Sequence, residues 1–246
     1  MIRHVTILDP TRTPVRWLAQ VPYLSKPTTI EFSPGLNVLW GPNGSGKSTI
    51  LTCLARLLHC EQGGRTVVTP TSLAEVEPHD GVVVNHDGQT TLYANPEHQV
   101  GLVGGLAGFD YDFGAEGAAN AMFRGSSGQR MLHTLDAILP VVQDGKIPAV
   151  EVRPRLRLPA YLKGSGEPGP TTILLDEPER SLGIPMQDRL WRWIRRQAAT
   201  HQFIVSSHTF FALDIPEAHY IDLDPSYRSE CVVAMRSLTT RSSSTS

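Results

Sequence analysis

Cysteine and long hydrophobic runs are both scarce in this sequence. Of its 246 residues three are cysteines, Cys53, Cys60 and Cys231, which form an odd and unpatterned set. Such a set argues against a disulfide framework and a zinc centre, and it fits a reducing compartment. No apolar run approaches the roughly 20 residues that cross a bilayer, and residues 1–10 lack the pattern of a signal peptide. We therefore expect a cytoplasmic protein that does not insert into a membrane.

An excess of charge of one sign is also absent. The 22 Lys and Arg residues nearly balance the 24 Asp and Glu residues, for a net charge of −2. A global basic field that would attract nucleic acid or an anionic membrane is therefore excluded. A hydrophobic content of 40% is typical of a folded globular protein. The length suits one domain, which we assign to residues 1–235, followed by a Ser/Thr-rich tail at 236–246 that we expect to be disordered.

Short apolar runs alternate with helical patterns along the chain. Strands are predicted at 2–8, 28–32, 35–39, 171–175, 202–206 and 220–223, and helices at 48–59, 127–139 and 185–199. Two more strands, 82–85 and 90–94, are predicted to pair as a hairpin across Asp87 and Gly88. Residues 140–170 are rich in proline and glycine, which indicates an inserted surface loop.

A glycine-rich loop stands between an apolar strand and a helix, the context that a phosphate-binding P-loop requires. Its residues are Gly41, Pro42, Asn43, Gly44, Ser45, Gly46, Lys47, Ser48 and Thr49. Glycines let backbone N–H groups curl around phosphate oxygens, and the start of the helix adds partial positive charge there. Lys47 is expected to reach the β and γ phosphates, and the Ser48 hydroxyl to ligate Mg²⁺. The loop therefore predicts nucleotide binding.

Two further apolar strands end in polar side chains that suit the same chemistry. The strand at 171–175 leads into Asp176 and Glu177, and open α/β sheets bind ligands at the carboxyl ends of their strands. Asp176 is expected to hold Mg²⁺ through water, and Glu177 to act as general base. His208 follows the strand at 202–206 and is a candidate to hydrogen-bond the γ phosphate or the attacking water. The alternative for Asp176 and Glu177 is that a strand merely ends in two acids at the surface. The alternative for His208 is a histidine in the core or at a helix cap.

A run of small polar residues precedes the predicted helix at 127–139. It reads Gly125-Ser-Ser-Gly-Gln129. Hydroxyl and free N–H groups at a helix start suit an anion, so Ser127 and Gly128 are candidates for nucleotide contact. The alternative is an ordinary serine cap of the helix.

The order of these motifs resembles that of the ATP-binding-cassette (ABC) ATPases. More narrowly, it resembles their soluble branch of RecF-like, structural-maintenance-of-chromosomes (SMC) and OLD-type AAA-family proteins. The resemblance rests on Leu175-Asp-Glu-Pro-Glu179 and Ser207-His-Thr-Phe-Phe-Ala-Leu213, and it covers residues 28–60 and 122–224. It implies an α/β P-loop fold with an ABC-type core, in which helices flank a mostly parallel sheet. An N-terminal antiparallel β subdomain and a small helical subdomain that carries Ser127 complete the expected fold.

The resemblance also implies an activity and an assembly. ATP and water would yield ADP and phosphate, with Lys47, Glu177 and His208 as the catalytic residues and Mg²⁺ on Ser48 and Asp176. Ser127 and Gly128 would complete the site of a second copy, so that ATP closes a homodimer. The expected partner is a nuclease, a nucleic acid, or a protein of DNA repair or defence. The alternatives are the ATP-binding subunit of a membrane ABC transporter and a nucleotide-gated switch that scarcely turns over.

Several positions depart from the family pattern or leave their role open. The signature run begins with Gly125 rather than leucine, and Gly183 stands where many members carry aspartate. Gln89 and Gln99 are both candidates for the glutamine that senses Mg²⁺. Tyr23 precedes the P-loop, where it is either a stacking partner for adenine or a core residue.

Two arginine clusters have two interpretations each. Alternating arginines share one face of a possible strand at 153–157, and four more line a helix at 189–196. Their members are Arg153, Arg155 and Arg157 in the first cluster, and Arg189, Arg192, Arg195 and Arg196 in the second. Each cluster either contacts nucleic-acid phosphates or is a solvated face.

Overall fold

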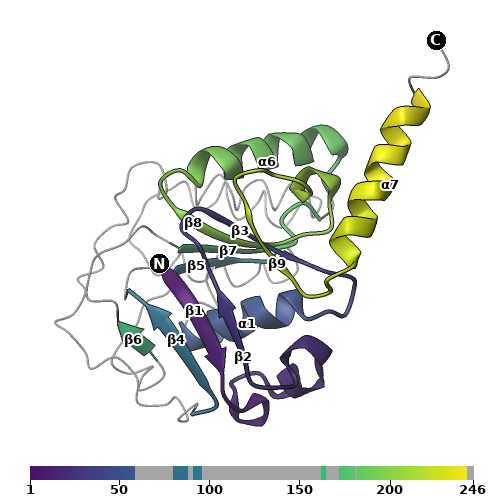
Figure 1. The fold of residues 1–246 in the computed structure, drawn as a ribbon. Coiled ribbons are helices and arrows are strands. Elements are labelled where there is room, and N and C mark those ends of the chain that lie inside the picture. Colours follow the sequence, from purple (N-terminus) through teal and green to yellow (C-terminus); the bar gives the residue numbers. More distant parts are fainter. Residues whose placement is uncertain (59–79, 88–90, 96–161, 165–171, 181, 243–246) are drawn as a thin grey trace, which may run out of the picture.

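Two β-sheets with a helix between them form the body of the protein in the computed structural model (Figure 1). The structure describes residues 1–58, 80–87, 91–95, 162–164, 172–180 and 182–242. The first sheet has the order β2-β1-β4-β6. Its strands are β1 (Ile2–Ile7), β2 (Thr28–Glu31), β4 (Val82–His86) and β6 (Leu162–Gly164). Strand β1 pairs antiparallel with β2 and β4, as predicted for the N-terminal subdomain, while β6 runs parallel to β4.

The second sheet is parallel throughout and has the order β5-β7-β8-β3-β9. Its strands are β3 (Leu36–Trp40), β5 (Thr91–Ala94), β7 (Thr172–Asp176), β8 (Gln202–Ser206) and β9 (His219–Asp222). Every residue of β3, β7 and β8 is buried. Continuous burial is what a parallel sheet covered on both faces requires, and it explains why these apolar runs do not alternate with polar residues.

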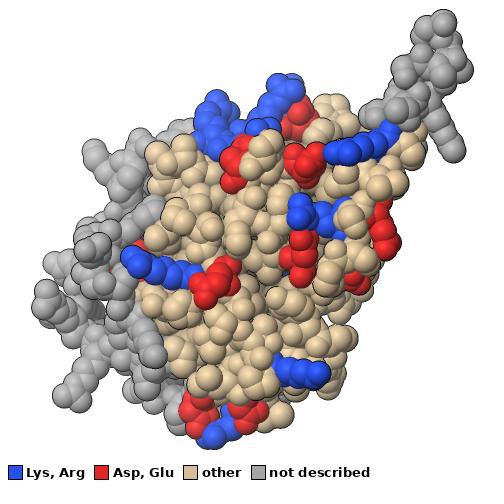
Figure 2. All heavy atoms as spheres, viewed as in Figure 1, with Lys and Arg blue, Asp and Glu red and all other residues tan. Residues whose placement is uncertain are grey.

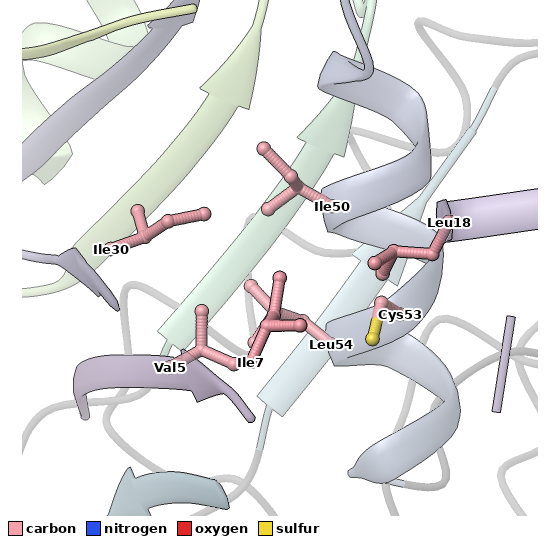
Figure 3. A pocket seen from close by; sticks show the side chains of 7 residues that line it. All are labelled: Val5, Ile7, Leu18, Ile30, Ile50, Cys53 and Leu54. Carbon is pink, nitrogen blue, oxygen red and sulfur yellow. The ribbon is translucent and has the colours of Figure 1, made fainter. Parts of the chain in front are cut away.

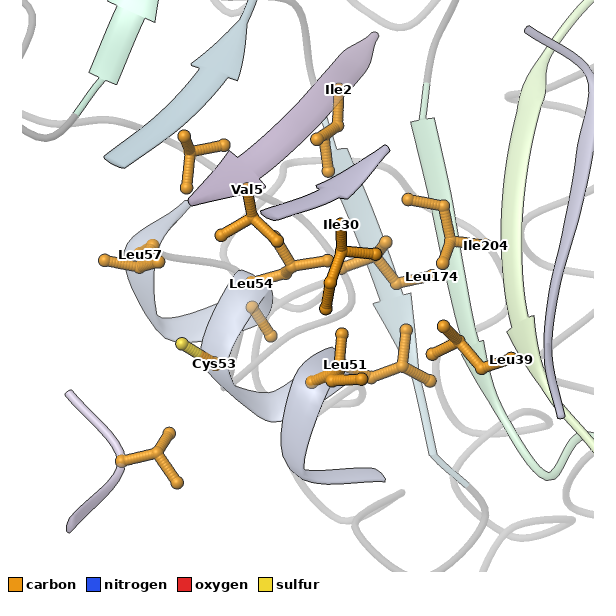
Figure 4. Close-up of a cluster of buried hydrophobic side chains, with 14 of the residues drawn as sticks. Ile2, Val5, Ile30, Leu39, Leu51, Cys53, Leu54, Leu57, Leu174 and Ile204 are labelled. Atoms are coloured by element: carbon orange, nitrogen blue, oxygen red, sulfur yellow. The ribbon is translucent and has the colours of Figure 1, made fainter. Parts of the chain in front are cut away.

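Helix α1 (Lys47–Leu57) separates the two sheets. Its buried side chains Leu51 and Leu54 join a hydrophobic cluster with Val5 of the first sheet and with Leu174 and Ile204 of the second (Figure 4). Because α1 follows the P-loop directly, this packing anchors the loop against both sheets.

The opposite face of the parallel sheet is covered by helix α6 (Ile184–Gln197) and by part of α7 (Tyr227–Ser242) (Figure 1). Trp191 and Ile194 of α6 are buried there, and the Trp193 ring meets Phe203 of β8 edge to face at 5.8 Å. The short 3-10 helices η1 (Pro10–Arg12), η2 (Arg16–Gln20), η3 (Pro22–Leu24) and η5 (Phe210–Ala212) lie in the connections. The expected α/β fold with a mostly parallel sheet flanked by helices is confirmed.

The predicted hairpin of residues 82–85 and 90–94 is wrong. Strand β4 pairs with β1 in the first sheet, whereas β5 pairs parallel with β7 in the second. Thr91 and Tyr93 of β5 are buried, so β5 extends the covered parallel sheet rather than an exposed ribbon. The buried His86 ring, whose Nε2 lies 3.1 Å from Thr91 Oγ1, links the two strands across this change of sheet.

The expected disorder from residue 236 is also wrong up to Ser242, where α7 ends. The first turns of α7 pack Tyr227, Cys231 and Met235 against the core, and a helix that has been nucleated gains one backbone hydrogen bond for each added residue. The helix therefore continues into the Ser/Thr-rich stretch and projects from the body (Figure 1). Residues 243–246, the predicted helix at 127–139 and the predicted loop at 140–170 lie outside the described residues.

A small apolar pocket lies between β1 and α1 (Figure 3). It is lined by Val5, Ile7, Leu18, Ile30, Ile50, Cys53 and Leu54. Burial raises the pKa of the Cys53 thiol to about 12, which keeps it protonated and unreactive. The pocket belongs to the core, and Cys53 serves there as a small apolar residue.

Candidate nucleotide-binding site

The P-loop follows β3 and ends where α1 begins at Lys47. Gly44 and Gly46 have φ angles of 79° and 103°, a region that residues with a Cβ atom seldom occupy. A Cβ on Gly46 would also lie 2.4 Å from Val21 Cγ1. The segment before η3 therefore packs so closely beneath the loop that only glycine fits at position 46.

We expect Gly46→Ala to lower the free energy of unfolding of the protein more than Gly44→Ala does. Both substitutions force alanine into a left-handed conformation, at a cost of about 1–2 kcal/mol. Gly44 is the matched control because a Cβ at this position would meet no atom of the described residues within 4 Å. The Gly46 variant meets Val21 in addition, and overpacking of this kind costs about 1–3 kcal/mol more. Chemical denaturation checks the difference, and equal losses in the two variants would contradict the tight packing of Val21.

The Lys47 side chain curls back over the P-loop. Its Nζ donates hydrogen bonds to the carbonyl oxygens of Gly41 at 2.8 Å and Pro42 at 3.0 Å. Burial lowers the pKa of Lys47, whereas the nearby carboxylates of Glu177 and Asp176 raise it. A buried cation held by loop carbonyls is placed to exchange these contacts for phosphate oxygens.

Asp176 is the centre of the polar contacts at the carboxyl end of β7. Its Oδ1 accepts hydrogen bonds from Ser48 Oγ at 2.9 Å and Ser206 Oγ at 2.5 Å, and its Oδ2 accepts one from Asn95 Nδ2 at 2.9 Å. Burial raises the pKa of Asp176, and the donors Ser206, Ser48 and Asn95 oppose that rise. The ends of three neighbouring strands and the start of α1 thus converge on one carboxylate, as ligand sites of parallel sheets do.

The donor set around Asp176 suits Mg²⁺. Ser48 and Asp176 offer a hydroxyl and a carboxylate oxygen side by side, and proteins commonly bind Mg²⁺ through one or two carboxylates together with substrate phosphates. No group of three or more His, Cys, Asp or Glu side chains that suits a metal occurs in the described part of the chain. The Ser48 hydroxyl and the Asp176 carboxylate fit a cation that also binds substrate phosphates.

Glu177 and His208 face each other beside this centre. His208 Nε2 lies 3.0 Å from Glu177 Oε1, and the two side chains are 30% and 27% exposed, so water can reach both. Burial lowers the pKa of His208, the Lys47 charge lowers it further, and Glu177 opposes both effects. Glu177 has a φ of 46°, and its N–H donates to the backbone oxygen of Ser206 at 3.2 Å and to its Oγ at 3.0 Å. A strained backbone that is held in this way often marks a functional position.

Sequence reasoning missed three residues of the site: Asn95, Ser206 and Glu179. Asn95 follows β5 directly and reaches Asp176. The rule that singled out His208, a polar residue after a buried parallel strand, would have found Asn95 if β5 had been assigned to the parallel sheet. Ser206 ends β8, and the buried Glu179 contacts the loop of His208.

Several predicted site residues lie outside the described part of the chain. They are Ser127, Gly128, Gln89, Gln99, Arg153, Arg155 and Arg157. Tyr23 is described, and its partly buried side chain packs against the hydrophobic cluster around α1, as the core alternative has it. The four arginines of α6 are exposed. Two of them form ion pairs, Arg192 with Asp188 and Arg195 with Glu217.

Comparisons with known proteins match the segment that contains the P-loop. Residues 21–67 match the family model described as an AAA domain. A 43-residue stretch is 46% identical to the chromosome partition protein Smc of Mycolicibacterium paratuberculosis. Another comparison gives 49% identity over 41 residues with the Smc protein of Mycobacterium tuberculosis. The segment that contains the P-loop is therefore similar in sequence to AAA domains and to Smc proteins. These matches cover 18% and 17% of this chain and 4% and 3% of the Smc chains.

Two solved structures align with about nine-tenths of the chain at low sequence identity. The SMC head domain from Thermotoga maritima aligns over 89% of this chain and 94% of its own, with 14% identity and a TM-score of 0.45. A nucleotide-free ATP-binding cassette from an ABC transporter aligns over 91% of this chain and 88% of its own, with 16% identity and a TM-score of 0.41.

The described helices include none that is both long and apolar enough to cross a membrane. Figure 2 shows acidic and basic side chains interspersed over one face of the protein, in keeping with the net charge of −2.

Proposed function

We propose that this ABC/SMC-type chain binds ATP with Mg²⁺ and hydrolyses it to ADP and phosphate. The observation that carries the proposal is the arrangement at the mouth of the P-loop. Asp176 contacts Ser48 at the start of α1, while Glu177 and His208 lie 3.0 Å apart beside them. A base, a neighbouring imidazole and a phosphate-binding lysine are the groups that nucleotide hydrolysis needs.

Each side chain of the site has its own role in the proposed reaction. Lys47 would hold the β and γ phosphates, and Ser48 and Asp176 would hold Mg²⁺, which would neutralise phosphate charge. Glu177 accepts a proton from the attacking water, whose oxygen forms a bond to the γ phosphorus as the bond to the β–γ bridging oxygen breaks. Burial and the Lys47 charge favour the neutral form of His208, which has a single ring N–H. In the complex His208 would donate that N–H to the γ phosphate instead of to Glu177.

We expect His208→Ala to lower ATP turnover about a hundredfold, the typical cost of losing one hydrogen bond that stabilises a transition state. His219→Ala is the matched control, because His219 lies at the amino end of its strand β9, away from the carboxyl ends that form the site. Phosphate release in the presence of Mg²⁺ measures both variants. Turnover in the His208 variant equal to that of the wild type would remove His208 from the mechanism, and no Mg²⁺-dependent turnover in the wild type would contradict the proposed activity.

The proposed biological role is an ATP-driven homodimer that acts with a nuclease, a nucleic acid, or a protein of DNA repair or defence. The sequence similarity to Smc, a chromosome partition protein, supports a process on DNA. Ser127 and Gly128 of each copy would complete the nucleotide site of the other. Purification of the ATP-loaded protein from native cells tests this role, because bound nucleic acid or nuclease would support it and a bound membrane permease would favour the transporter alternative.

A further inference from the structure

Glu179 is a buried acidic residue on the loop that follows β7, two positions after Glu177. Its side chain is 7% exposed. The backbone of this loop is already closed by two of its own hydrogen bonds, from Arg180 N to Glu177 O and from Leu182 N to Glu179 O, both at 3.0 Å. The Glu179 carboxylate is therefore not needed to close its own turn.

The carboxylate instead contacts the neighbouring loop, which carries His208. Glu179 Oε1 accepts a hydrogen bond from Ser207 Oγ at 2.5 Å and a second from the backbone N–H of His208 at 3.0 Å. Ser207 is fully buried, and its Oγ also accepts a hydrogen bond from Thr209 N at 3.2 Å. One carboxylate oxygen thus holds both the residue before His208 and the backbone of His208 itself.

The burial of the Glu179 carboxyl group is unfavourable for folding stability. Glu179 Oε2 is buried and has no hydrogen-bond partner among the described residues, and burial raises the pKa of the carboxyl group against the effect of its two donors. Burying a carboxylate with an unpaired oxygen lowers stability by several kcal/mol in general. A residue kept for stability alone would more often be apolar at such a position, so the contact with the His208 loop is what the carboxylate contributes.

We propose that Glu179 is a positioning residue that holds the backbone of His208 against the loop of Glu177, and that it thereby sets the contact between Glu177 and His208. The two loops leave the carboxyl ends of neighbouring strands, β7 and β8, and each carries one member of the pair. Ser206 fixes the backbone of Glu177, and Glu179 fixes that of His208. This inference rests on the proposed function, since it concerns the same reaction.

Kinetic constants of Glu179 variants test the proposal. Glu179→Ala should lower kcat by roughly ten- to a hundredfold, because a displacement of about 1 Å in a reacting group can cost on the order of a hundredfold. The KM for ATP should stay within about twofold, since the P-loop is untouched. Glu179→Gln keeps the length and the Oε1 acceptor, so it should restore kcat to within about threefold of the wild type.

Two more variants separate positioning from stability. Ser207→Ala removes one of the two donors to Glu179 and should give an intermediate kcat, even if Glu179→Ala fails to fold. Gln202→Ala is the matched control: Gln202 is also fully buried, at the opposite end of β8, where it hydrogen-bonds to the backbone of Ile2 and Ser33. It should lower the melting temperature and leave kcat unchanged. A Ser207→Ala or Glu179→Ala protein that loses stability but keeps the kcat of the wild type would overturn the proposal.

The backbone amide of His208 supplies a readout that needs no turnover. A hydrogen bond to a carboxylate or to a side-chain amide oxygen shifts a backbone amide proton downfield and slows its exchange with solvent. In NMR spectra we expect both features in the wild type and in Glu179→Gln, and neither in Glu179→Ala. An amide signal that is the same in the wild type and Glu179→Ala would show that Glu179 does not hold His208. Absence of turnover in the wild type would instead contradict the proposed function, and the amide signal would still decide whether Glu179 holds the loop.

Discussion

Replacing Lys47 with alanine is expected to lower ATP affinity by on the order of a hundred- to ten-thousandfold while the fold survives. The ammonium group contacts only the carbonyl oxygens of Gly41 and Pro42 among the hydrogen bonds found in the described structure. In the complex it would form two charge-assisted hydrogen bonds to phosphate, and each is worth about 1.5–3 kcal/mol. Their loss corresponds to the stated change in affinity.

Titration with a fluorescent ATP analogue, combined with thermal unfolding, measures the effect of Lys47→Ala. Lys26→Ala is the control, because Lys26 is an exposed lysine outside the P-loop and its loss should change neither affinity nor melting temperature. An unchanged affinity and ATPase activity in the Lys47 variant would remove the P-loop assignment altogether.

A second large effect is expected from Glu177→Gln, which should bind ATP but hydrolyse it very slowly. Glutamine keeps the shape of Glu177 but cannot accept the proton of the attacking water, and loss of a general base lowers turnover by about 10²–10⁴-fold. Asp176 and Ser48, which contact each other at 2.9 Å, remain to hold Mg²⁺. If ATP closes a homodimer, the trapped variant should run as a dimer in light scattering, while the wild type in ADP should be largely monomeric.

Ser127→Arg in the same protein tests the arrangement of that dimer. Ser127 lies outside the described residues, and its placement against the γ phosphate of the other copy is part of the proposal. Arginine would put a bulky cation into that pocket, so the double variant should return to the monomer and still bind ATP through Lys47. A Glu177→Gln protein that stays monomeric at saturating ATP and Mg²⁺ would count against the dimer and leave Ser127 as a helix cap.

Local sequence patterns were sufficient for most elements of the parallel sheet. The predicted strand at 202–206 matches β8, and the predicted strands at 35–39 and 171–175 each differ by one residue from β3 and β7. Such strands are buried on both faces, so an uninterrupted apolar run is a sufficient signal. The P-loop is equally local, because its glycines, its lysine and the following helix are consecutive.

Local sequence patterns did not predict the contacts between segments that are distant in the sequence. Strands β4 and β5 lie close in sequence, with turn-forming residues between them, yet they pair in different sheets. Because β5 was predicted in a hairpin, Asn95 was not predicted as a site residue. Its contact with Asp176 joins positions 81 residues apart. Likewise nothing near Glu179 in the sequence indicates that its carboxylate binds the N–H of His208.

By itself the sequence was sufficient to predict the kind of chemistry that we propose, because a P-loop, a strand that ends in two acids and a strand followed by histidine each consist of a few consecutive residues. Only the tertiary structure decided which side chains meet: that Asp176 gathers Ser48, Ser206 and Asn95, and that Glu179 joins the two loops that carry Glu177 and His208. The physical reason is that hydrogen bonds and burial act over a few ångströms in space. The residues they join stand far apart along the chain until the parallel strands align their carboxyl ends.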